Sequence, residues 1–215
     1  MYFYPKGLNM DDLVNQCLGK LGNELVSKIT TKGKLRVFQP GEAIVKTGQV
    51  VRYLPIVLNG AVKIFSEEKT AHFHLYYINP GEPCVFSFAH LFSLEPQSFS
   101  ALAETESTLI LLDVKTAEEL FDNHPSFSRM IVAAYQKHYN QLLSTIIGLS
   151  SDRLEERILN FLIQKITITR KNPITISQPE IASDMGTSRE VVSRLLKKLE
   201  ENKKIVREGK KIKVL

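Results

Sequence analysis

Four polar side chains near the end of the chain stand at helical spacing and have the chemistry to bond to nucleic acid bases. They are Arg189, Glu190, Ser193 and Arg194. An arginine guanidinium can donate to both O6 and N7 of guanine, and a glutamate can accept a hydrogen bond from N4 of cytosine. We therefore interpret this set, the recognition stripe, as a base-reading surface for the major groove of DNA.

A second group of side chains around the recognition stripe is suited to the phosphate backbone. Hydroxyl and ammonium groups bond to phosphate oxygens and hold a protein on the duplex without reading its sequence. The predicted backbone contacts are Ser177, Thr187, Ser188, Lys197, Lys203, Lys204 and Lys210. Two simpler interpretations stay open. Thr187 and Glu190 also have the spacing of a capping box, and the lysines also suit a solvated face paired with Glu200 and Glu201.

Two helices and a hairpin must position these residues. A helix that begins at Thr187 or Ser188 is predicted from apolar residues at i, i+3, i+4 and i+7. These residues are Val192, Leu195, Leu196 and Leu199. A shorter helix is predicted between a Ser177 cap and Gly186, and two strands around Glu208-Gly209 follow as a basic wing. The pattern is typical of a winged helix-turn-helix domain.

The positive charge of the chain is concentrated in this region. The whole chain has 28 Lys and Arg against 23 Asp and Glu, a net charge of +5. Residues 151–215 hold 15 of the basic and 9 of the acidic residues, whereas residues 1–150 hold 13 and 14. A basic module on a near-neutral body is typical of a protein that binds a polyanion, here double-stranded DNA.

A long helix over residues 126–149 carries apolar and aromatic residues at alternating spacings of three and four. They are Val132, Tyr135, Tyr139, Leu142, Ile146 and Leu149. No member of this seam is charged, so we expect the helix to pair with its own copy in a homodimer. The helix can also lie on its own barrel through Ile131, Leu143 and Ile147, and both arrangements can hold together.

The body of the chain is a series of short strands separated by turn signals such as Asn59-Gly60 and Asn79-Pro80-Gly81. The predicted strands are Leu35–Phe38, Ile44–Lys46, Leu54–Leu58, Ala61–Phe65, His72–Ile78 and Leu109–Val114. The sequence therefore predicts an α+β protein in three parts. These are an antiparallel β-barrel or jelly-roll sensor domain (1–115), a hinge and long dimerisation helix (116–150), and a winged helix-turn-helix domain (151–215).

With these motifs the chain resembles the Crp/Fnr family of bacterial transcription regulators over essentially its whole length. The resemblance rests on Phe38-x-Pro40-Gly41-Glu42, Asn59-Gly60-x-Val62-Lys63, Pro80-Gly81-Glu82 and the run from Ile181 to Leu196. It implies a cyclic-nucleotide-binding-like barrel, a dimerisation helix and a winged helix-turn-helix. It also implies that Arg189, Glu190 and Arg194 read the base pairs of each half-site, and that Ser193 is a further contact. RNA polymerase is a candidate partner, although no sequence feature identifies a surface for it.

The chain departs from the cyclic-nucleotide-binding members of this family where the ligand is held. Their Gly-Glu-Leu and Arg-Ser-Ala segments match Val85-Phe86-Ser87 and Phe99-Ser100-Ala101 here. A cyclic phosphate buried beside Phe86 and Phe99 has no cationic partner, so cyclic AMP is not the expected effector. The predicted effector pocket is apolar and suits an apolar ligand, a haem or no ligand. Its residues are Val85, Phe86, Phe88, Phe99, Leu142 and Leu143.

No metal site or cofactor is predicted with certainty from the residues. The candidate axial ligands of a haem are His72, His74, Cys84, His90 and His138. Two cysteines, Cys17 and Cys84, are too few for a family-type iron–sulfur cluster. Cys84 follows Pro83 at an expected strand end, where an accessible thiol is open to oxidation.

The sequence contains no motif of a common enzyme class, so we expect no catalytic activity. There is no phosphate-binding glycine loop, no His-Glu-x-x-His and no Gly-x-Ser-x-Gly. There is also no secretory signal and no membrane-spanning apolar run, which predicts a cytoplasmic protein without membrane contact. Two alternatives stay open: a cupin-like small-molecule or metal-binding enzyme that uses His72 and His74, and a DNA-bridging dimer without an effector.

Overall fold

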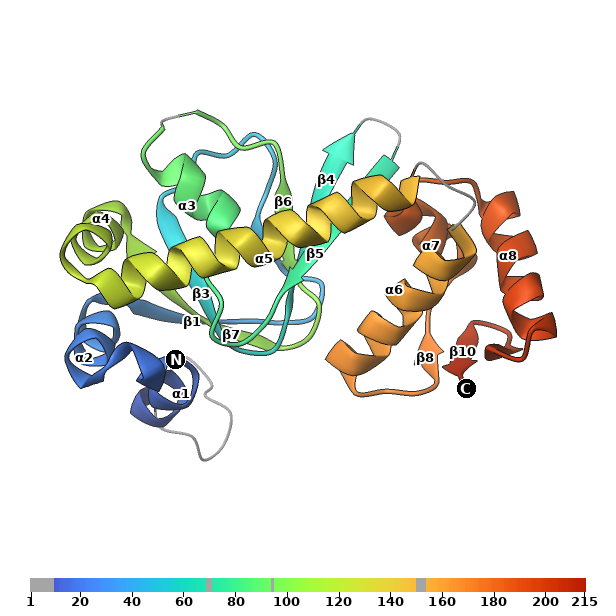
Figure 1. The fold of residues 1–215 in the computed structure, drawn as a ribbon, viewed down its shortest axis with the longest axis horizontal. Coiled ribbons are helices and arrows are strands. Elements are labelled where there is room, and N and C mark those ends of the chain that lie inside the picture. The colour runs from blue at the N-terminus through green and yellow to red at the C-terminus, as the bar shows by residue number, and fades with distance from the viewer. Residues whose placement is uncertain (1–9, 69–70, 94, 150–153) are drawn as a thin grey trace. The chain divides into compact units, whose positions relative to one another are not determined.

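The computed structural model describes residues 10–68, 71–93, 95–149 and 154–215 (Figure 1). Residue contacts gather into two compact units. The first comprises Met1–Ile64 with Tyr76–Asn140, and the second comprises Phe65–Leu75 with Gln141–Leu215. Antiparallel sheets and helices occur in the same chain, which confirms the predicted α+β class. The predicted domain limits at residues 115 and 150 stay a prediction.

The strands of the barrel form two antiparallel sheets. One has the order β1-β7-β3, with β1 at Lys34–Phe38, β7 at Ser107–Asp113 and β3 at Tyr53–Asn59. The other has the order β2-β6-β4-β5, from Ala43–Val45, Ser100–Ala103, Val62–Glu68 and Ala71–Ile78. All six predicted strands are present. Sequence patterning missed β6, because the strand has only four residues, three of them small, and shows no clear alternation.

The turn between β3 and β4 shows why a glycine stands there. Gly60 has a φ of 83°, which is a left-handed conformation that side chains disfavour. A Cβ at this position would lie 2.3 Å from the carbonyl oxygen of Glu106. Residue 60 is therefore restricted to glycine both by its φ angle and by the close approach of a neighbouring chain segment.

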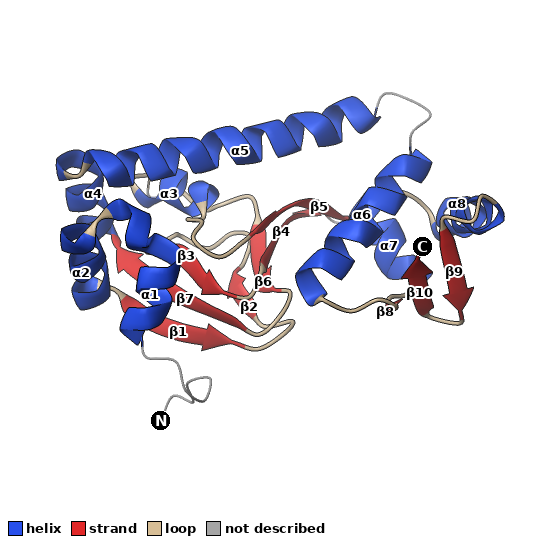
Figure 2. Cartoon of the chain, turned by 60° about the horizontal axis from the view of Figure 1, so that its bottom comes forward, coloured by secondary structure: helices blue, strands red, loops and turns tan. Residues whose placement is uncertain are grey.

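Helices cover the β1-β7-β3 sheet and close the main core (Figure 2). They are α1 (Met10–Leu18), the 3-10 helix η1 (Gly19–Leu21), α2 (Asn23–Lys32), α3 (Val85–Leu91) and α4 (Val114–Asn123). The core between them includes Val14 and Ile29 from the helices, and Ile56 and Ile110 from the sheet, all essentially unexposed. Burial of this apolar surface is the main source of the unit's stability.

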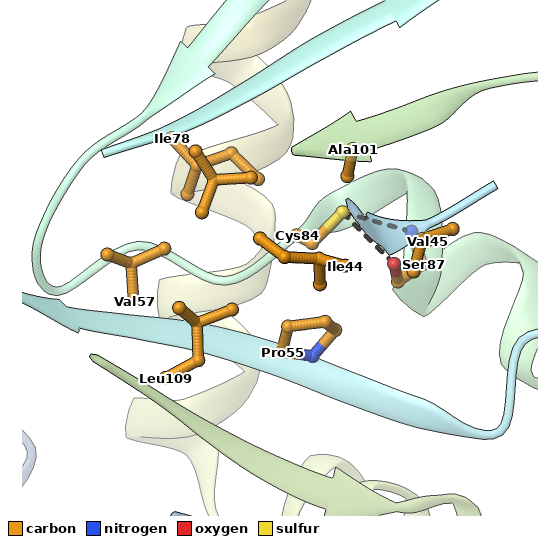
Figure 3. Close-up of a pocket in the computed structure, with 10 residues that line it drawn as sticks. Ile44, Val45, Pro55, Val57, Ile78, Cys84, Ser87, Ala101 and Leu109 are labelled. Carbon is orange, nitrogen blue, oxygen red and sulfur yellow. Dashed lines mark hydrogen bonds between the residues drawn. The ribbon is translucent and has the colours of Figure 1, made fainter. Parts of the chain in front are cut away.

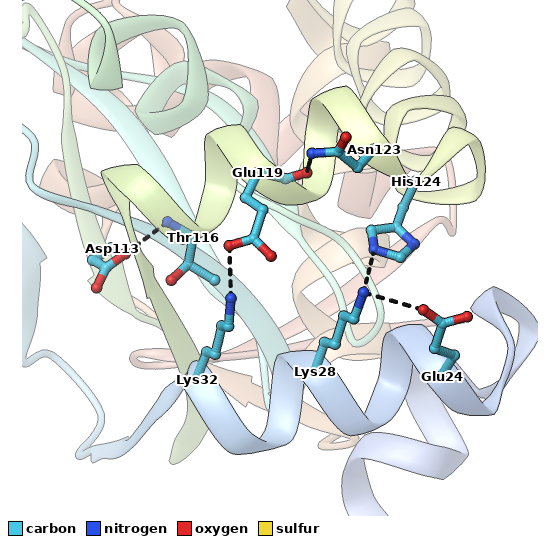
Figure 4. Close-up of polar contacts among 8 residues, drawn as sticks. All are labelled: Glu24, Lys28, Lys32, Asp113, Thr116, Glu119, Asn123 and His124. Carbon is cyan, nitrogen blue, oxygen red and sulfur yellow. Dashed lines mark hydrogen bonds and ion pairs between the residues drawn. The ribbon is translucent and has the colours of Figure 1, made fainter.

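Polar contacts join α2 to α4 at the edge of this core (Figure 4). The Lys32 ammonium lies 2.6 Å from the Glu119 carboxylate, and Lys28 lies 3.1 Å from Nε2 of His124. Asp113 caps α4 by accepting a hydrogen bond of 2.8 Å from the backbone N–H of Thr116. Because the ion pair is exposed, it contributes little to stability and mainly fixes the two helices in register.

The long helix α5 spans Pro125–Leu149, close to the predicted 126–149. After it come α6 (Leu154–Thr169), β8 (Ile174–Thr175), α7 (Gln178–Met185), α8 (Arg189–Glu201), β9 (Ile205–Glu208) and β10 (Lys211–Val214). The last three strands form an antiparallel sheet of order β8-β10-β9. These elements enclose a second apolar core that includes Phe161, Leu162 and Leu196. Among the described residues, no helix is long and apolar enough to cross a membrane.

Candidate DNA-binding site and effector region

The first helix of the helix-turn-helix, α7, has a serine cap and a glycine end, as predicted. The Ser177 hydroxyl accepts a hydrogen bond of 3.3 Å from the backbone N–H of Glu180. Gly186 ends the helix in the left-handed conformation, with φ 64° and ψ 41°. The N–H of Thr187 then donates to the carbonyl of Ala182 over 3.0 Å. This closed turn sets the direction in which α8 leaves.

The second helix, α8, buries one face in the core of the C-terminal unit. Val192, Leu196 and Leu199 are at most 2% exposed, and Leu195 is partly buried against them. The four predicted core positions of this helix are thus confirmed. Because these positions face inward, the opposite face must point to solvent.

The recognition stripe lies on that outer face. Arg189, Glu190 and Arg194 are exposed, and Ser193 is half-buried. Neither Arg189 nor Arg194 forms an ion pair within the described part of the chain, so both guanidinium groups keep their donors available. The structure brings the four predicted base-reading residues together on one surface, while their contact with bases stays a prediction.

The start of α8 differs from the predicted capping box. Ser188, not Thr187, is the cap, and its hydroxyl accepts a hydrogen bond of 3.4 Å from the N–H of Val191. The nearby Glu190 backbone N–H and the Ser188 hydroxyl lower the pKa of the Glu190 carboxyl. The Thr187–Glu190 capping box is therefore wrong, because the helix begins one residue later than that pairing requires.

The lysines predicted to contact phosphates fall into two groups. Lys197 lies 3.9 Å from Glu201, one turn away, as the solvated-face interpretation requires. Lys203, Lys204 and Lys210 are exposed and form no ion pair in the part of the chain that the structure describes. These three side chains face solvent without a carboxylate partner among the described residues, which suits an anionic partner.

Glu200 has a different partner from the one predicted. Its Oε2 accepts hydrogen bonds from Nε and Nη2 of Arg207 over 3.0 and 2.7 Å, and its Oε1 accepts from the Arg207 backbone N–H over 3.0 Å. These hydrogen bonds from Arg207 lower the pKa of the Glu200 carboxyl. The predicted pairing of Glu200 with a lysine is therefore wrong. Sequence analysis treated Arg207 only as one of the wing's charges, since spacing alone does not single out one cation.

Three of the seam residues of α5 are exposed in the part of the chain that the structure describes. Val132 and Tyr139 are 61% and 60% exposed, and Tyr135 is 37% exposed. Ile131 on the adjoining face is 1% exposed, so the helix does lie on its own barrel through that residue. Leu142 and Leu143 are half-buried. The side chains of Ile146, Ile147 and Leu149 lie outside the described residues.

Aromatic rings of the chain gather where Phe86 and Phe99 were predicted to replace the ligand-binding groups. The rings of Phe86 and Phe99 have centroids 5.2 Å apart, and Phe86 meets Tyr76 edge-on at 5.3 Å. Tyr76 in turn stacks on His138 of α5. The two phenylalanines therefore contact each other directly rather than facing an open space.

Two other predicted pocket residues, Val85 and Phe88, lie in the interior of the unit. Val85 is 1% exposed. Phe88 belongs to the main core and packs against Phe121, with ring centroids 5.1 Å apart. This differs from the predicted shared pocket of Phe86 and Phe88. The segment is helical, and residues two apart on a helix point to different sides, whereas on a strand they point to the same side.

A small cavity lies between the two sheets of the barrel (Figure 3). It is lined by Ile44, Val45, Pro55, Val57, Val62, Ile78, Cys84, Ser87, Ala101 and Leu109. None of the six predicted pocket residues lines it. Its volume is about 10 Å³, which is about what one water molecule needs. A haem does not fit this cavity.

Cys84 is not the accessible thiol that its place after Pro83 suggested. It is 2% exposed and caps α3, and its Sγ accepts a hydrogen bond of 3.1 Å from the Ser87 hydroxyl (Figure 3). Burial raises the pKa of this thiol. An oxidation sensor needs an exposed thiolate, so the prediction of a reactive Cys84 is wrong.

The other candidate haem ligands whose side chains are described have different immediate neighbours. Nδ1 of His90 lies 2.8 Å from the carbonyl oxygen of Phe86, and His74 is buried. The side chain of His72 lies outside the described residues, so its predicted pairing with His74 stays untested. Across the described ranges, no three His, Cys, Asp or Glu side chains gather in a way that could hold a metal ion.

Comparison with known protein families assigns both parts of the chain. A model described as "Cyclic nucleotide-binding domain" matches residues 35–124, and one described as "Crp-like helix-turn-helix domain" matches residues 156–215. The chain is also 24% identical over 225 residues to the transcriptional activator protein Anr of Pseudomonas protegens. That match covers 98% of this chain and 84% of Anr.

Solved structures show the same fold. A transcriptional regulator of the Crp/Fnr family from Eubacterium rectale has a TM-score of 0.77 at 17% identity, with 92% of each chain covered. The c-di-GMP-responsive global regulator CLP of Xanthomonas campestris has a TM-score of 0.76 at 20% identity, with 89% of this chain and 98% of that chain covered.

Proposed function

Because the chain belongs to the Crp/Fnr family of transcription regulators, we propose that it is a homodimer that binds a specific, near-palindromic DNA site. Each subunit would place α8 in the major groove, in successive grooves about 34–36 Å apart. The observation that carries this proposal is the recognition stripe, with Arg189, Glu190 and Arg194 exposed, on a helix whose opposite face packs into the apolar core.

Within this proposal each group on α8 has a separate task. Arg189 and Arg194 donate to guanine, Glu190 accepts from cytosine, and Ser193 bonds to a neighbouring base or sugar. The cap hydroxyl of Ser188 stands beside Glu190 at the first turn, where it favours an ordered carboxylate before DNA arrives. Such ordering lowers the entropy cost of binding.

Contacts to phosphate would come from the ends of the same elements. Ser177 and Thr187 stand at the start of α7 and in the turn, and the exposed Lys203, Lys204 and Lys210 stand beside or within the wing. These groups supply affinity that falls as salt rises, and they do not discriminate between sequences.

The dimer in this proposal forms through α5. Its outer face presents Val132, Tyr135 and Tyr139 to solvent, and large exposed apolar side chains on one stripe are typical of a coiled-coil partner surface. Pairing of α5 with its copy holds two α8 helices on one molecule, and a palindromic site requires two.

Cyclic nucleotides are not the effector in this proposal, although the fold is that of their binding domain. Phe86 and Phe99 lie ring against ring at the positions where the ligand's polar partners would stand. A buried phosphate beside them lacks a cation, which costs several kcal/mol. Regulation by a different ligand, or none, is compatible with the described residues.

Binding of the full-length protein to a duplex selected from a random library tests the function. Affinity is measured for the selected and a scrambled duplex by fluorescence anisotropy across a potassium chloride series. We expect the selected duplex to bind at least 10³-fold more tightly at physiological salt, which is at the low end for specific regulators. Equal affinity for both duplexes at every salt concentration would contradict sequence-specific regulation.

The alternative of a cupin-like enzyme gains no support. The curated relatives are transcription regulators, which favours a role without catalysis. RNA polymerase stays a candidate partner through this family membership alone.

A further inference from the structure

Besides apolar packing in a shared core, a charged pair of residues joins the wing to the recognition helix. Glu200 stands in the last turn of α8, and Arg207 stands in β9. Both carboxylate oxygens of Glu200 are engaged, because Oε2 accepts two hydrogen bonds from the Arg207 guanidinium and Oε1 accepts one from its backbone N–H. Bonds to a charged acceptor with this geometry are stronger and more directional than a surface ion pair.

The bond to the backbone has a particular role in the sheet. The strand order is β8-β10-β9, so β9 is an edge strand with unpaired backbone groups on its outer side. Arg207 pairs with Ile212 of β10 in the sheet register. The backbone N–H of Arg207 donates its hydrogen bond to Glu200. The carboxylate therefore takes the place of a missing neighbouring strand and joins the edge of the wing to α8.

The wing lysines lie on the chain segments next to this pair. The chain reverses between α8 and β9 through Lys203, which has a φ of 54°, and the N–H of Lys204 bonds to the carbonyl of Leu199. Lys203 and Lys204 are exposed here, as is Lys210 at the far end of the hairpin. Among the side chains of the wing hairpin, Arg207 reaches back to α8 with its guanidinium.

We propose that Arg207 is a positioning residue, which binds Glu200 so that the wing lysines meet the phosphates flanking the bases read by α8. Arg207 therefore does not contact DNA itself. This inference rests on the proposed function, since it assigns the wing's part in DNA binding. It runs against the simplest expectation for an arginine in a basic wing, which is a direct phosphate contact.

The variant Glu200→Gln separates the two roles. It keeps the size of the side chain and removes the negative charge that holds Arg207. If Arg207 is a positioning residue, the wing loosens and affinity for the selected duplex falls, despite the loss of a negative charge near DNA. If Arg207 instead contacts a DNA phosphate, the same variant releases its guanidinium from Glu200, so affinity rises and the salt dependence becomes steeper.

Glu201→Gln is the matched control, because it makes the same change one residue away. Glu201 is exposed and lies 3.9 Å from Lys197, with no bond to the wing. We expect this control to bind as tightly as the wild type or slightly more tightly. Glu200→Gln and Arg207→Ala should each bind the selected duplex several-fold more weakly than the wild type. Both variants should also reduce the steepness of log K against log salt by about 1 or more, because each lost phosphate contact reduces this slope by about 0.9.

Two further readouts distinguish positioning from general damage. In each variant, the ratio of affinities for the selected and scrambled duplexes should stay within about twofold of the wild-type ratio, because the wing reads no bases. The double variant Glu200→Gln/Arg207→Ala should bind like Arg207→Ala alone, because both changes break the same contact. Equal binding by Glu200→Gln and Glu201→Gln, or tighter binding by Glu200→Gln, would overturn the positioning role.

Hydrogen exchange of the free protein keeps the outcomes distinct. The Arg207 amide should exchange faster in Glu200→Gln than in the wild type or Glu201→Gln, and unchanged exchange would overturn the contact itself. If the wild type binds no duplex, the proposed function fails and the positioning role falls with it. If the wild type prefers the selected duplex and Glu200→Gln binds it as tightly as Glu201→Gln does, the proposed function stands and the positioning role of Arg207 is refuted.

Discussion

The imidazole of His138 stacks on the ring of Tyr76, with centroids 4.1 Å apart and planes inclined by 18°. Tyr76 belongs to β5, and His138 belongs to α5, where it points about 100° around the helix axis from the exposed Tyr139. Both rings are at most 2% exposed. One face of α5 is thus bound to its own barrel by aromatic packing, which leaves the other face for a partner.

Truncation at this stack should destabilise the barrel. His138→Ala removes a ring that is 1% exposed and leaves a cavity against Tyr76. By comparison with other large-to-small changes in cores, we expect the free energy of unfolding to fall by about 2–4 kcal/mol. Urea denaturation at pH 7 measures the change. Gln136→Ala, on an exposed position of the same helix, is the control and should change it by less than about 0.5 kcal/mol.

The hydroxyl of Tyr76 is a second test of this region. It is buried and has no hydrogen-bond partner among the described residues, and burial raises the pKa of Tyr76. Tyr76→Phe removes an unpaired polar group and keeps the stacked ring. The variant should be as stable as the wild type or more stable by up to about 1 kcal/mol. A clear loss of stability would show that the hydroxyl does have a partner.

Glu82 should give the barrel a pH dependence in the acid range. Burial opposes the charged form of Glu82, but the imidazole of His138, 3.6 Å from its carboxylate, and hydrogen bonds from Lys137 and the N–H of Asn79 outweigh it and lower the pKa. A carboxyl with a lowered folded pKa stabilises the protein above its unfolded pKa of about 4.3, and this contribution is lost as pH falls further. Glu82→Gln should therefore be less stable than the wild type at pH 7. Urea midpoints at pH 7 and below pH 4 should show the difference shrinking.

The success of sequence analysis in the C-terminal part has a local cause. A cap at Ser177, a glycine end at Gly186 and apolar spacing from Val192 onward are short-range signals, and the structure contains all three. The segment after Pro83 has no such signal. α3 is only seven residues long and carries Val85, Phe86 and Phe88, which also favour strands, so neither its helical form nor the burial of Cys84 was predicted.

Pairing between elements was less predictable than the elements themselves. Glu200 has several cations near it in the sequence, and spacing favours a lysine on its own helix. The choice of Arg207 depends on the tight turn at Lys203 and on the edge position of β9, which are tertiary features. The contact of Phe86 with Phe99 likewise joins residues from two elements, α3 and the chain before β6.

Charge on the outer face of α5 should prevent dimerisation. Tyr139→Glu places a carboxylate at a position where the native side chain is 60% exposed in the isolated subunit. In the proposed dimer the same position is buried. Burial of an unpaired charge at an interface costs about 2–5 kcal/mol, so the dimer dissociation constant should rise more than tenfold. Sedimentation equilibrium measures it. Gln136→Glu introduces the same charge outside the seam, and an equal effect of both variants would contradict the proposed interface.

The two kinds of DNA contact should separate in a pair of alanine variants. Arg194 is exposed on the recognition stripe without an ion pair among the described residues, and Lys204 is exposed beside the wing. Arg194→Ala removes the proposed bidentate base contact, so it should cost about 1–3 kcal/mol on the selected duplex and relax the preference at one base pair of each half-site. Lys204→Ala removes only a proposed phosphate contact, so it should weaken selected and scrambled duplexes alike and reduce the salt slope by about 1. Anisotropy titrations with single-base variants of the site measure both effects.

Arg129→Ala, an exposed arginine at the start of α5, controls for loss of net charge and should leave the preference intact. If Arg194→Ala keeps the full preference at every base pair, the outer face of α8 is not the surface that reads the site.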